Sequence, residues 1–477
     1  MLFNSFEFLL FFPFVTLLYF VVPHKFRWFL LLISSCFFYS FFKWEYIFIL
    51  LFTIVIDYFA GIWISKSSGK KKKWALIISL VANIGVLALF KYYYFIIDNF
   101  NALSFKINQT AFDPLWHFIL PIGLSFHTFQ AMSYTIEVYR GNQKVEKNFG
   151  IYALYVMFYP QLVAGPIERP QNILHQFYEK HDFNYNNVKS GIRLMLWGMF
   201  KKVIIADNLS VFVNRIYDHP SNYQGLPLVV ATLFFSIQIY CDFSGYSDIA
   251  LGSARAMGFN LMKNFDRPYI SKSISEFWKR WHISLSTWFR DYLYIPLGGN
   301  RVPKIRRYFN LFFVFMMSGL WHGASWNYVI WGALHGIYLI IGQLAGNFQD
   351  KIFGIFKNSK IINAIHVCIT ILLVVFAWIF FRAKTFKDAK YIISNLFSSN
   401  SHSFSEVVKM IGVKELLTVL IGILILELVQ WMQGKKDLGT WIEKLPKWQR
   451  WGIYYFLLFF IITFGYFGEV QFIYFQF

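Results

Sequence analysis

Hydrophobic residues in this chain gather in long blocks, and polar residues are confined to the segments between them. A helix needs about 20 apolar residues to cross the hydrocarbon core of a bilayer. We predict crossings near residues 8–22, 27–42, 46–64, 75–97, 150–165, 192–206, 227–241, 310–321, 326–345, 361–381, 413–432 and 451–467. We expect residues 118–136 to dip into the membrane as well. The pattern predicts an all-α, polytopic transmembrane protein with about ten to twelve membrane-spanning helices, plus re-entrant or interfacial helices.

The composition agrees with a membrane protein and excludes an ordinary soluble one. Of the 477 residues, 57% are hydrophobic and 22% aromatic, including 58 Phe, while only 15% are charged. A soluble domain has about 25% charged residues. Because no soluble domain, low-complexity tract or clear long-period repeat is visible, we predict one integral-membrane domain over residues 1–477, with its core signature in residues 270–340.

The distribution of basic residues predicts the orientation of the chain. The turn after the first block, residues 24–27, and the turn after the third, residues 66–73, are rich in Lys, Arg and His, whereas the turn between them has only Lys43 and Glu45. Cytoplasmic loops carry an excess of Lys and Arg. We therefore expect the N-terminus to be extracytoplasmic. The first block has no basic segment before it and no small-residue cleavage site, so we do not expect it to be a cleaved signal.

The net charge of +20 is explained by basic cytoplasmic loops that lie beside anionic lipid. Nucleic acid is not an expected partner because the chain has no soluble basic domain. The three cysteines, Cys36, Cys241 and Cys368, lie singly within apolar blocks. Since no pair has metal-ligand or C-x-x-C spacing, we expect no metal site, no disulfide framework and no bound cofactor.

Residues 262–309 are polar for their position yet rich in aromatic residues. Ser273 and Glu276 have the spacing of a capping box and predict the start of a helix. An apolar stripe follows at helical spacing: Phe277, Trp281, Leu285, Trp288 and Tyr292. The turn sequence PLGGN, residues 296–300, ends the predicted helix. A helix with an aromatic face and a basic face is typical of the membrane interface.

Two features of this segment are not explained by an interfacial anchor alone. His282 lies in the middle of the aromatic stripe, and the pair Arg290–Asp291 is flanked by Phe and Tyr. We therefore treat His282 as a candidate site residue.

Two long motifs of this region resemble the signature of the membrane-bound O-acyltransferase family. They are FWKRWHISLSTWFRDYLYIPLGGNR, residues 277–301, and SGLWHGASWNYVIWGALHG, residues 318–336. Other segments are similar to the bacterial alginate O-acetyltransferase branch of this family. They are FYPQLVAGPIERP, residues 158–170, QIYCDFSGYSDIALG, residues 238–252, and both ends of the chain. Membrane enzymes that acetylate peptidoglycan, or load D-alanine for teichoic acid, share most of these motifs, so the resemblance indicates the chemistry better than the substrate.

The resemblance implies helices around a central tunnel and a catalytic role for His322. Transfer of an acyl group from a thioester to a hydroxyl needs a base, and imidazole, with a pKa of about 6.5, suits that task. An ionisable residue within a membrane segment is a functional candidate by default. We predict His322 and His282 as catalytic residues, with Trp321 and Ser325 as binding residues beside His322.

His335 repeats the setting of His322, since each precedes the second glycine of its motif. The two histidines are 13 residues apart and would face different ways on one helix, at about 100° per residue. Either is also explained by a hydrogen bond to a neighbouring helix. His127, after a Pro-Ile-Gly break, is assigned a packing role.

The resemblance also implies that acetyl-coenzyme A, as acyl donor, reaches the site from the cytoplasm. Its phosphates need basic partners, which the aromatic and basic segment offers. The predicted donor or substrate residues there are Lys279, Arg280, Trp281, Arg290 and Asp291, with Arg301 nearby. No Ser-His-Asp hydrolase constellation is readable, so we expect a separate extracytoplasmic acetyltransferase or acyl-carrier protein as partner.

Two further polar segments have expected structural roles. Asp242 and Asp248 lie beside apolar runs, and buried carboxylates are seldom left without a partner, so ion pairs with Arg255 or Arg267 are expected. The sequence LVAGPIERP, residues 162–170, predicts a broken helix and a loop.

The predicted function is a multi-pass inner-membrane O-acetyltransferase that passes acetyl across the membrane to an extracytoplasmic polysaccharide, either an alginate-like exopolysaccharide or peptidoglycan. D-alanyl transfer for teichoic acid is an alternative. An ion-coupled transporter, in which membrane-embedded His and Asp relay ions, is a second alternative. A transporter predicts two similar halves, and none is found in the sequence.

Overall fold

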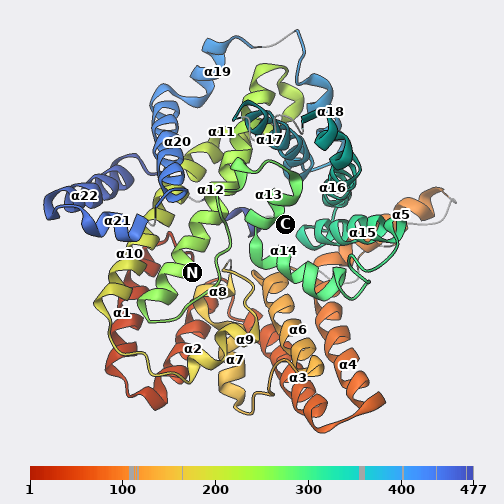
Figure 1. Ribbon diagram of the computed structural model, residues 1–477, viewed down its shortest axis with the longest axis vertical. Coiled ribbons are helices and arrows are strands. Elements are labelled where there is room, and N and C mark those ends of the chain that lie inside the picture. Colours follow the sequence, from red (N-terminus) through yellow and green to blue (C-terminus); the bar gives the residue numbers. More distant parts are fainter. Residues whose placement is uncertain are drawn as a thin grey trace. The chain divides into compact units, whose positions relative to one another are not determined.

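The computed structural model describes residues 1–106, 112, 114, 118–163, 165–353, 360–399, 402–436, 438–468 and 470–475. Every regular element in these ranges is a helix (Figure 1), which confirms the all-α prediction. The chain forms two compact units. Unit 1 contains Met1–Ile192 and Ala250–Met262, and unit 2 contains Arg193–Ile249 and Lys263–Phe477. The single integral-membrane domain stays a prediction.

The helices of the first half of the chain are α1 (Phe6–Val21), α2 (His24–Ser40), α3 (Tyr46–Lys66), α4 (Gly69–Leu87), the π-helix η1 (Ala88–Tyr92), α5 (Tyr93–Lys106), α6 (Leu124–Arg140), α7 (Phe149–Met157), α8 (Tyr159–Leu162), α9 (Pro170–Ile173), the 3₁₀-helix η2 (His175–Phe177), α10 (Tyr185–Met199), the π-helix η3 (Phe200–Ala206), α11 (Asp207–Asp218), the 3₁₀-helix η4 (Pro220–Asn222) and α12 (Leu226–Ala256).

The helices of the second half are the 3₁₀-helix η5 (Pro268–Ile270), α13 (Ile274–Arg280), α14 (Ile283–Phe289), the π-helix η6 (Arg290–Tyr294), α15 (Lys304–His322), α16 (Trp326–Phe353), α17 (Lys360–Arg382), α18 (Phe386–Asn395), α19 (Phe404–Ile411), α20 (Val413–Gln433), α21 (Leu438–Lys444), α22 (Lys447–Phe464) and the 3₁₀-helix η8 (Ile473–Phe475).

Six helices among the described residues are long and apolar enough to cross a membrane. They span Tyr46–Lys66, Gly69–Ser104, Leu226–Ala256, Trp326–Ala345, Lys360–Arg382 and Val413–Gln433. The protein is therefore a multi-pass membrane protein, while the count of about ten to twelve crossings stays a prediction.

The crossing predicted over residues 150–165 is wrong. The helix α7 has nine residues. It is therefore about 14 Å long, about half the thickness of the hydrocarbon core. It ends because Phe158 adopts a non-helical ψ of 111°. The short helix α8 and an extended segment follow, which confirms the broken helix predicted over residues 162–170.

The core of unit 1 includes the three helices α3, α4 and α6, which pack side by side (Figure 1). Asp57 of α3 is fully buried among them. Its carboxylate accepts hydrogen bonds from the Ser79 hydroxyl at 2.6 Å and from the Asn83 amide at 2.8 Å, both on α4. His127 of α6 bonds the Thr53 hydroxyl at 2.7 Å through Nε2, in agreement with its predicted packing role.

In unit 2 the helices α15 and α16 pack closely along their length. The approach depends on glycine: a Cβ at Gly319 would lie 2.1 Å from the Tyr328 carbonyl oxygen, and one at Gly332 would lie 2.2 Å from the Phe315 carbonyl oxygen. The small residues around His322 therefore allow the backbones to meet, as their sequence predicted.

The apolar stripe predicted that the aromatic and basic segment is one continuous helix, and this prediction is wrong. The break lies at His282, which has a φ of 42° and a ψ of 57°, a left-handed conformation that ends α13 and precedes α14. The start of α13 was predicted correctly, since the Ser273 hydroxyl accepts from the Glu276 backbone N–H at 3.1 Å. Non-glycine residues in the left-handed region store strain and gather at functional sites.

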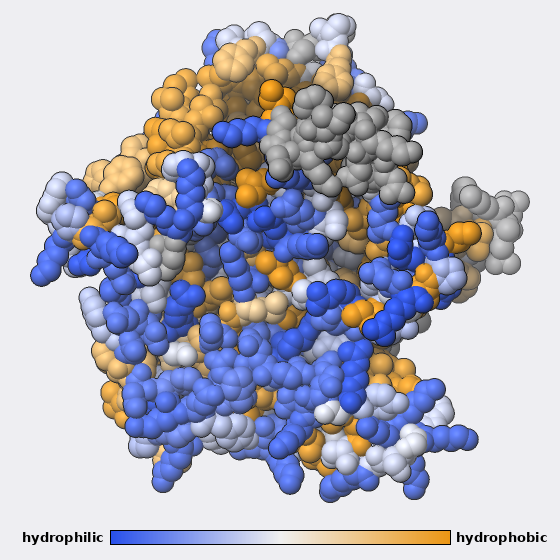
Figure 2. Space-filling view, viewed as in Figure 1, coloured by the Kyte–Doolittle hydropathy of each residue, from blue (hydrophilic) through white to orange (hydrophobic). Residues whose placement is uncertain are grey.

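Apolar side chains are exposed over α20 (Figure 2), where Leu417, Leu424 and Trp431 are each more than half exposed. Exposed apolar residues on a helix of this length are suited to contact with lipid. They agree with the prediction that residues 413–432 cross the membrane.

Candidate functional site

His322 is the last residue of α15 and is buried in unit 2. Four aromatic rings surround its imidazole, with centroids 4.9 to 5.6 Å away. They are Trp321, Trp331, Phe381 and Tyr474. The rings leave His322 only 3% exposed, and a setting poor in water strengthens electrostatic interactions.

His282 lies in the same aromatic cluster and is also fully buried. Its ring lies 4.6 Å from the Phe243 ring. Its Nδ1 lies 3.1 Å from the Asn264 side-chain oxygen. Burial lowers the pKa of His282 to about 3, so its imidazole is neutral at physiological pH.

The two predicted catalytic histidines share two neighbours. Trp321 and Tyr474 each contact the His322 ring, and each has its ring centroid 6.2 Å from that of His282. His322, His282, Trp321 and Tyr474 therefore lie together, and we call these four residues the histidine cluster. A neutral imidazole has one ring nitrogen that can accept a proton and return it.

Tyr474 belongs to η8 near the C-terminus, and a buried ion cluster holds this helix in place. The Ile473 backbone N–H donates to the Asp242 carboxylate at 2.8 Å. The other Asp242 oxygen lies 2.7 Å from the Lys202 ammonium, which also lies 2.7 Å from Asp207. All three charged side chains are almost fully buried.

The predicted ion-pair partners of the two aspartates are corrected by this arrangement. Asp242 pairs with Lys202, and Asp248 pairs with Lys201 at 2.8 Å, rather than with Arg255 or Arg267. Both lysines come from the π-helix η3, and both pair with aspartates of α12. The structural role predicted for both aspartates is confirmed.

His335 of α16 is buried beside the histidine cluster rather than facing away from it. The 13-residue spacing predicted that the two histidines face different ways on one helix. That prediction is wrong because α15 ends at His322 and α16 begins at Trp326. The Trp331 ring contacts both imidazoles, at 5.0 Å each. His335 Nδ1 accepts from the Trp278 indole N–H at 3.3 Å, which is the predicted bond between helices.

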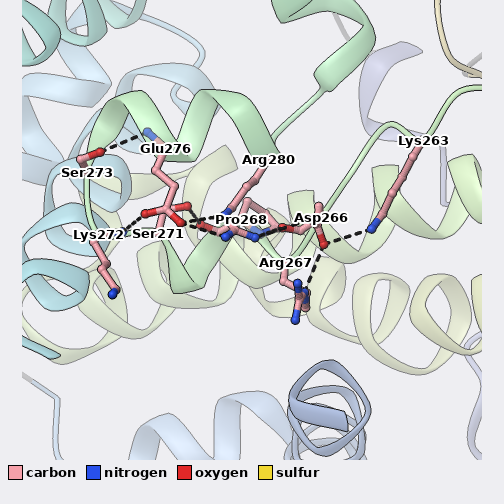
Figure 3. Close-up of polar contacts among 9 residues, drawn as sticks. All are labelled: Lys263, Asp266, Arg267, Pro268, Ser271, Lys272, Ser273, Glu276 and Arg280. Atoms are coloured by element: carbon pink, nitrogen blue, oxygen red, sulfur yellow. Dashed lines mark hydrogen bonds and ion pairs between the residues drawn. The ribbon is translucent and has the colours of Figure 1, made fainter. Parts of the chain in front are cut away.

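Arg280 is engaged in a carboxylate cluster next to α13 (Figure 3). Its guanidinium lies 2.9 Å from Glu276 and 3.6 Å from Asp266. Asp266 is also paired with Lys263 and Arg267, at 3.0 and 3.1 Å. Of its two carboxylate partners, Asp266 lies in the loop before α13 and Glu276 lies in α13. Arg280 therefore holds this loop against the helix.

The other predicted binding residues lie in different settings. Lys279 is exposed, and Arg290 is exposed with its guanidinium 2.8 Å from Asp291. Trp281 is buried between the rings of Phe265, Phe277 and Trp378. The Ser325 hydroxyl accepts from the Asn327 backbone N–H at 3.1 Å and so caps α16.

Three residues in or beside the histidine cluster were not predicted from the sequence as site residues. Lys202 is a charge inside an apolar block, which alone marks it for function or pairing. Tyr474 lies in the closing aromatic sequence that supports the family resemblance. Asn264 lies in the polar stretch before α13, and nothing in its local sequence indicates that it contacts His282.

Within the ranges that the structure describes, no three His, Cys, Asp or Glu side chains gather as metal ligands.

Comparison with known proteins identifies a family and several similar proteins. The membrane-bound O-acyltransferase family profile matches residues 142–383. A probable alginate O-acetylase of Pseudomonas aeruginosa is 38% identical, covering 85% of this chain and 76% of that protein. A peptidoglycan O-acetyltransferase of Helicobacter pylori is 36% identical over 80% of this chain and 75% of its own length. A teichoic acid D-alanyltransferase of Streptococcus thermophilus is 33% identical, but covers only 46% of this chain and 56% of its own.

Proposed function

Because the chain belongs to the membrane-bound O-acyltransferase family and is an acyltransferase, we propose that it takes acetyl from cytoplasmic acetyl-coenzyme A and passes it across the membrane. The acceptor at the end of this transfer is an extracytoplasmic polysaccharide, of the alginate or peptidoglycan type. A separate extracytoplasmic acetyltransferase or acyl carrier receives the group first. The proposed location is the inner membrane, with the N-terminus outside.

The observation that carries the proposal is the buried pair of histidines within a wall of aromatic rings. In the proposed reaction, His322 accepts the proton of the acceptor hydroxyl while that oxygen attacks the thioester carbonyl carbon. A C–O bond forms and the C–S bond breaks. The proton then returns from the imidazole to the leaving thiolate, which departs as the free thiol of coenzyme A. Imidazole catalyses both proton transfers at neutral pH.

The extent of similarity favours acetyl over D-alanyl as the transferred group. The relatives whose names specify O-acetylation cover at least four-fifths of this chain, whereas the D-alanyltransferase of Streptococcus thermophilus covers less than half. Unit 2, which contains the histidine cluster, includes both motifs that resemble the family.

The donor phosphates are proposed to bind at the exposed cations beside α13 and α14. Lys279 and Arg290 are exposed, as is Arg301, while Arg280 already has two carboxylate partners. Exposed Arg and Lys side chains are suited to phosphate groups, and Arg binds them with two parallel hydrogen bonds.

The test uses inverted membrane vesicles from cells that produce the protein, supplied with acetyl-coenzyme A labelled in the acetyl group. We expect alkali-labile label in the vesicle material together with release of coenzyme A thiol. The variant His322→Ala should lower turnover by about 100-fold or more, the effect of losing general-base catalysis.

The matched control is His127→Ala, which removes a buried histidine of unit 1 that bonds Thr53 and lies in no predicted site. Both variants must insert to the wild-type level. Near-normal transfer by His322→Ala would remove that residue from the reaction. Transfer of label from D-alanine-charged carrier, and none from acetyl-coenzyme A, would replace the proposed substrate.

A further inference from the structure

Asn264 lies at the centre of a buried polar group beside His282. Its side-chain oxygen accepts from the Ser284 backbone N–H at 3.2 Å and from the Ser284 hydroxyl at 2.9 Å. Its side-chain nitrogen donates to the Ser247 hydroxyl at 3.2 Å. Asn264, His282, Ser284 and Ser247 are each at most 2% exposed. The group is thus closed to solvent and its hydrogen bonds are set by the protein.

These contacts fix the orientation of the Asn264 amide. A backbone N–H can only donate, so the Asn264 atom that faces Ser284 N must be the oxygen.

The same oxygen then determines which nitrogen of His282 holds a proton. His282 Nδ1 lies 3.1 Å from it, and an amide oxygen can only accept. Nδ1 must therefore carry the hydrogen. In a neutral imidazole, this leaves the lone pair on Nε2. Burial keeps His282 neutral by lowering its pKa to about 3.

The backbone of Asn264 also helps to hold His282 in place. The Ile283 N–H donates to the Asn264 carbonyl at 2.9 Å, so main chain and side chain of Asn264 together hold residues 282–284. This is the turn in which His282 adopts its left-handed φ of 42°. A strained backbone conformation persists only where the surrounding contacts stabilise it, and the contacts of Asn264 stabilise that of His282.

We propose that Asn264 is a positioning residue that holds His282 as the Nδ1–H tautomer, so that Nε2 of His282 is a hydrogen-bond acceptor. In the proposed acyl transfer His322 takes the single proton of the acceptor hydroxyl, while His282 serves at Nε2 as a hydrogen-bond acceptor and does not donate to the developing oxyanion. This inference rests on the proposed function for its catalytic consequence, but the tautomer itself does not depend on any substrate.

The direct test is ¹⁵N solid-state NMR of the full-length protein, labelled at histidine and reconstituted in lipid, with His282 assigned by difference from His282→Gln. We expect a pyridine-type shift for Nε2 and a pyrrole-type shift for Nδ1. The variant Asn264→Leu should lose this single pattern. A proton on Nε2 in the wild-type protein would overturn the proposal, whatever the reaction of the enzyme.

The kinetic test compares Asn264→Leu with Asn264→Asp in the vesicle assay with labelled acetyl-coenzyme A. Asn264→Leu has no acceptor for His282, and we expect kcat to fall about 10- to 100-fold, the usual effect of removing an orienting partner of a site histidine, with the donor KM unchanged. Asn264→Asp keeps an acceptor, so most of the turnover should remain.

The pH profile separates positioning from a merely structural role. In Asn264→Asp the carboxylate raises the pKa of His282, and the Nε2 acceptor is lost when pH falls through that pKa. The acid limb of the kcat profile should therefore move to higher pH. The control Asn310→Leu removes an equally buried amide, which donates to the Leu297 carbonyl, and should lower stability without a selective loss of kcat.

Equal loss in Asn264→Asp and Asn264→Leu, in proteins with wild-type thermal stability, would overturn the positioning role, as would an unmoved acid limb. If wild-type vesicles transfer no acetyl label, the proposed function fails. The NMR measurement then decides the tautomer and the role of Asn264 by itself.

Discussion

Replacing Lys202 by methionine removes the cation that lies between two buried carboxylates. Lys202 is 1% exposed, and its ammonium lies 2.7 Å from both Asp207 and Asp242. At an effective dielectric constant of about 20, each attraction is about 6 kcal/mol before the cost of desolvation. Removal of one partner of a buried ion pair typically destabilises a protein by about 3–5 kcal/mol, because the remaining charge has no compensation.

We expect Lys202→Met to lower the unfolding temperature of the purified protein by about 10 °C, since about 1 kcal/mol corresponds to about 2–4 °C for a unit of this size. The assay is thermal unfolding in detergent, followed by intrinsic Trp fluorescence. The triple variant Lys202→Met, Asp207→Asn, Asp242→Asn removes all three charges and should recover much of the loss. In that variant the amide oxygen that takes the place of the Asp242 carboxylate still accepts from the Ile473 N–H.

The matched control is Lys201→Met, which breaks the pair with Asp248, a carboxylate that is 23% exposed. The loss should be smaller because water partly solvates Asp248. An unfolding temperature of Lys202→Met within about 2 °C of the wild type, less than the shift expected for even 1 kcal/mol, would refute the argument from buried charge. A triple variant less stable than the single one would refute it as well.

Three further predictions address pH, donor and orientation. Burial raises the pKa of Glu168 to about 7 from 4.5, so the stability that its protonated form contributes is complete below about pH 4.5 and lost as pH rises through about 7. The unfolding temperature should fall as pH rises across this window, and Glu168→Gln should flatten this dependence; an equally steep curve in the variant would assign it to other groups. Arg290→Gln should raise the KM for acetyl-coenzyme A several-fold, with a larger effect at low salt, and leave kcat unchanged. Asp291→Asn, which breaks the same ion pair, is measured beside it. A stable Arg290→Gln variant with the wild-type KM would leave the Arg290–Asp291 pair a structural role only. In a cysteine-free background, a cysteine introduced at Ser68 should react with a membrane-permeant maleimide and not with an impermeant one in intact cells; labelling by the impermeant reagent would reverse the predicted orientation.

The proposed donor site shows which features the local sequence predicts and which it does not. The spacing of Phe277, Trp281 and Leu285 is helical, and it correctly predicts that these side chains are buried. It did not predict the break at His282, because a left-handed residue leaves the hydrophobic spacing on either side unchanged. The same spacing presented Arg280 as a candidate for a phosphate, while the tertiary structure gives it two carboxylates.

The sequence by itself determined the helical class, the membrane-spanning blocks around α3, α12, α16, α17 and α20, and the position of His322 in a glycine-bounded motif. These properties are local, since hydrophobicity, helical periodicity and caps act over a few turns of chain. Only the tertiary structure decided which residues surround that histidine. Asp242 holds Ile473 across 231 residues of sequence, and Lys202 lies between aspartates of two helices. Such contacts are fixed by the need of buried charges and backbone groups for partners, and that need can be met by any residue that the fold brings within reach.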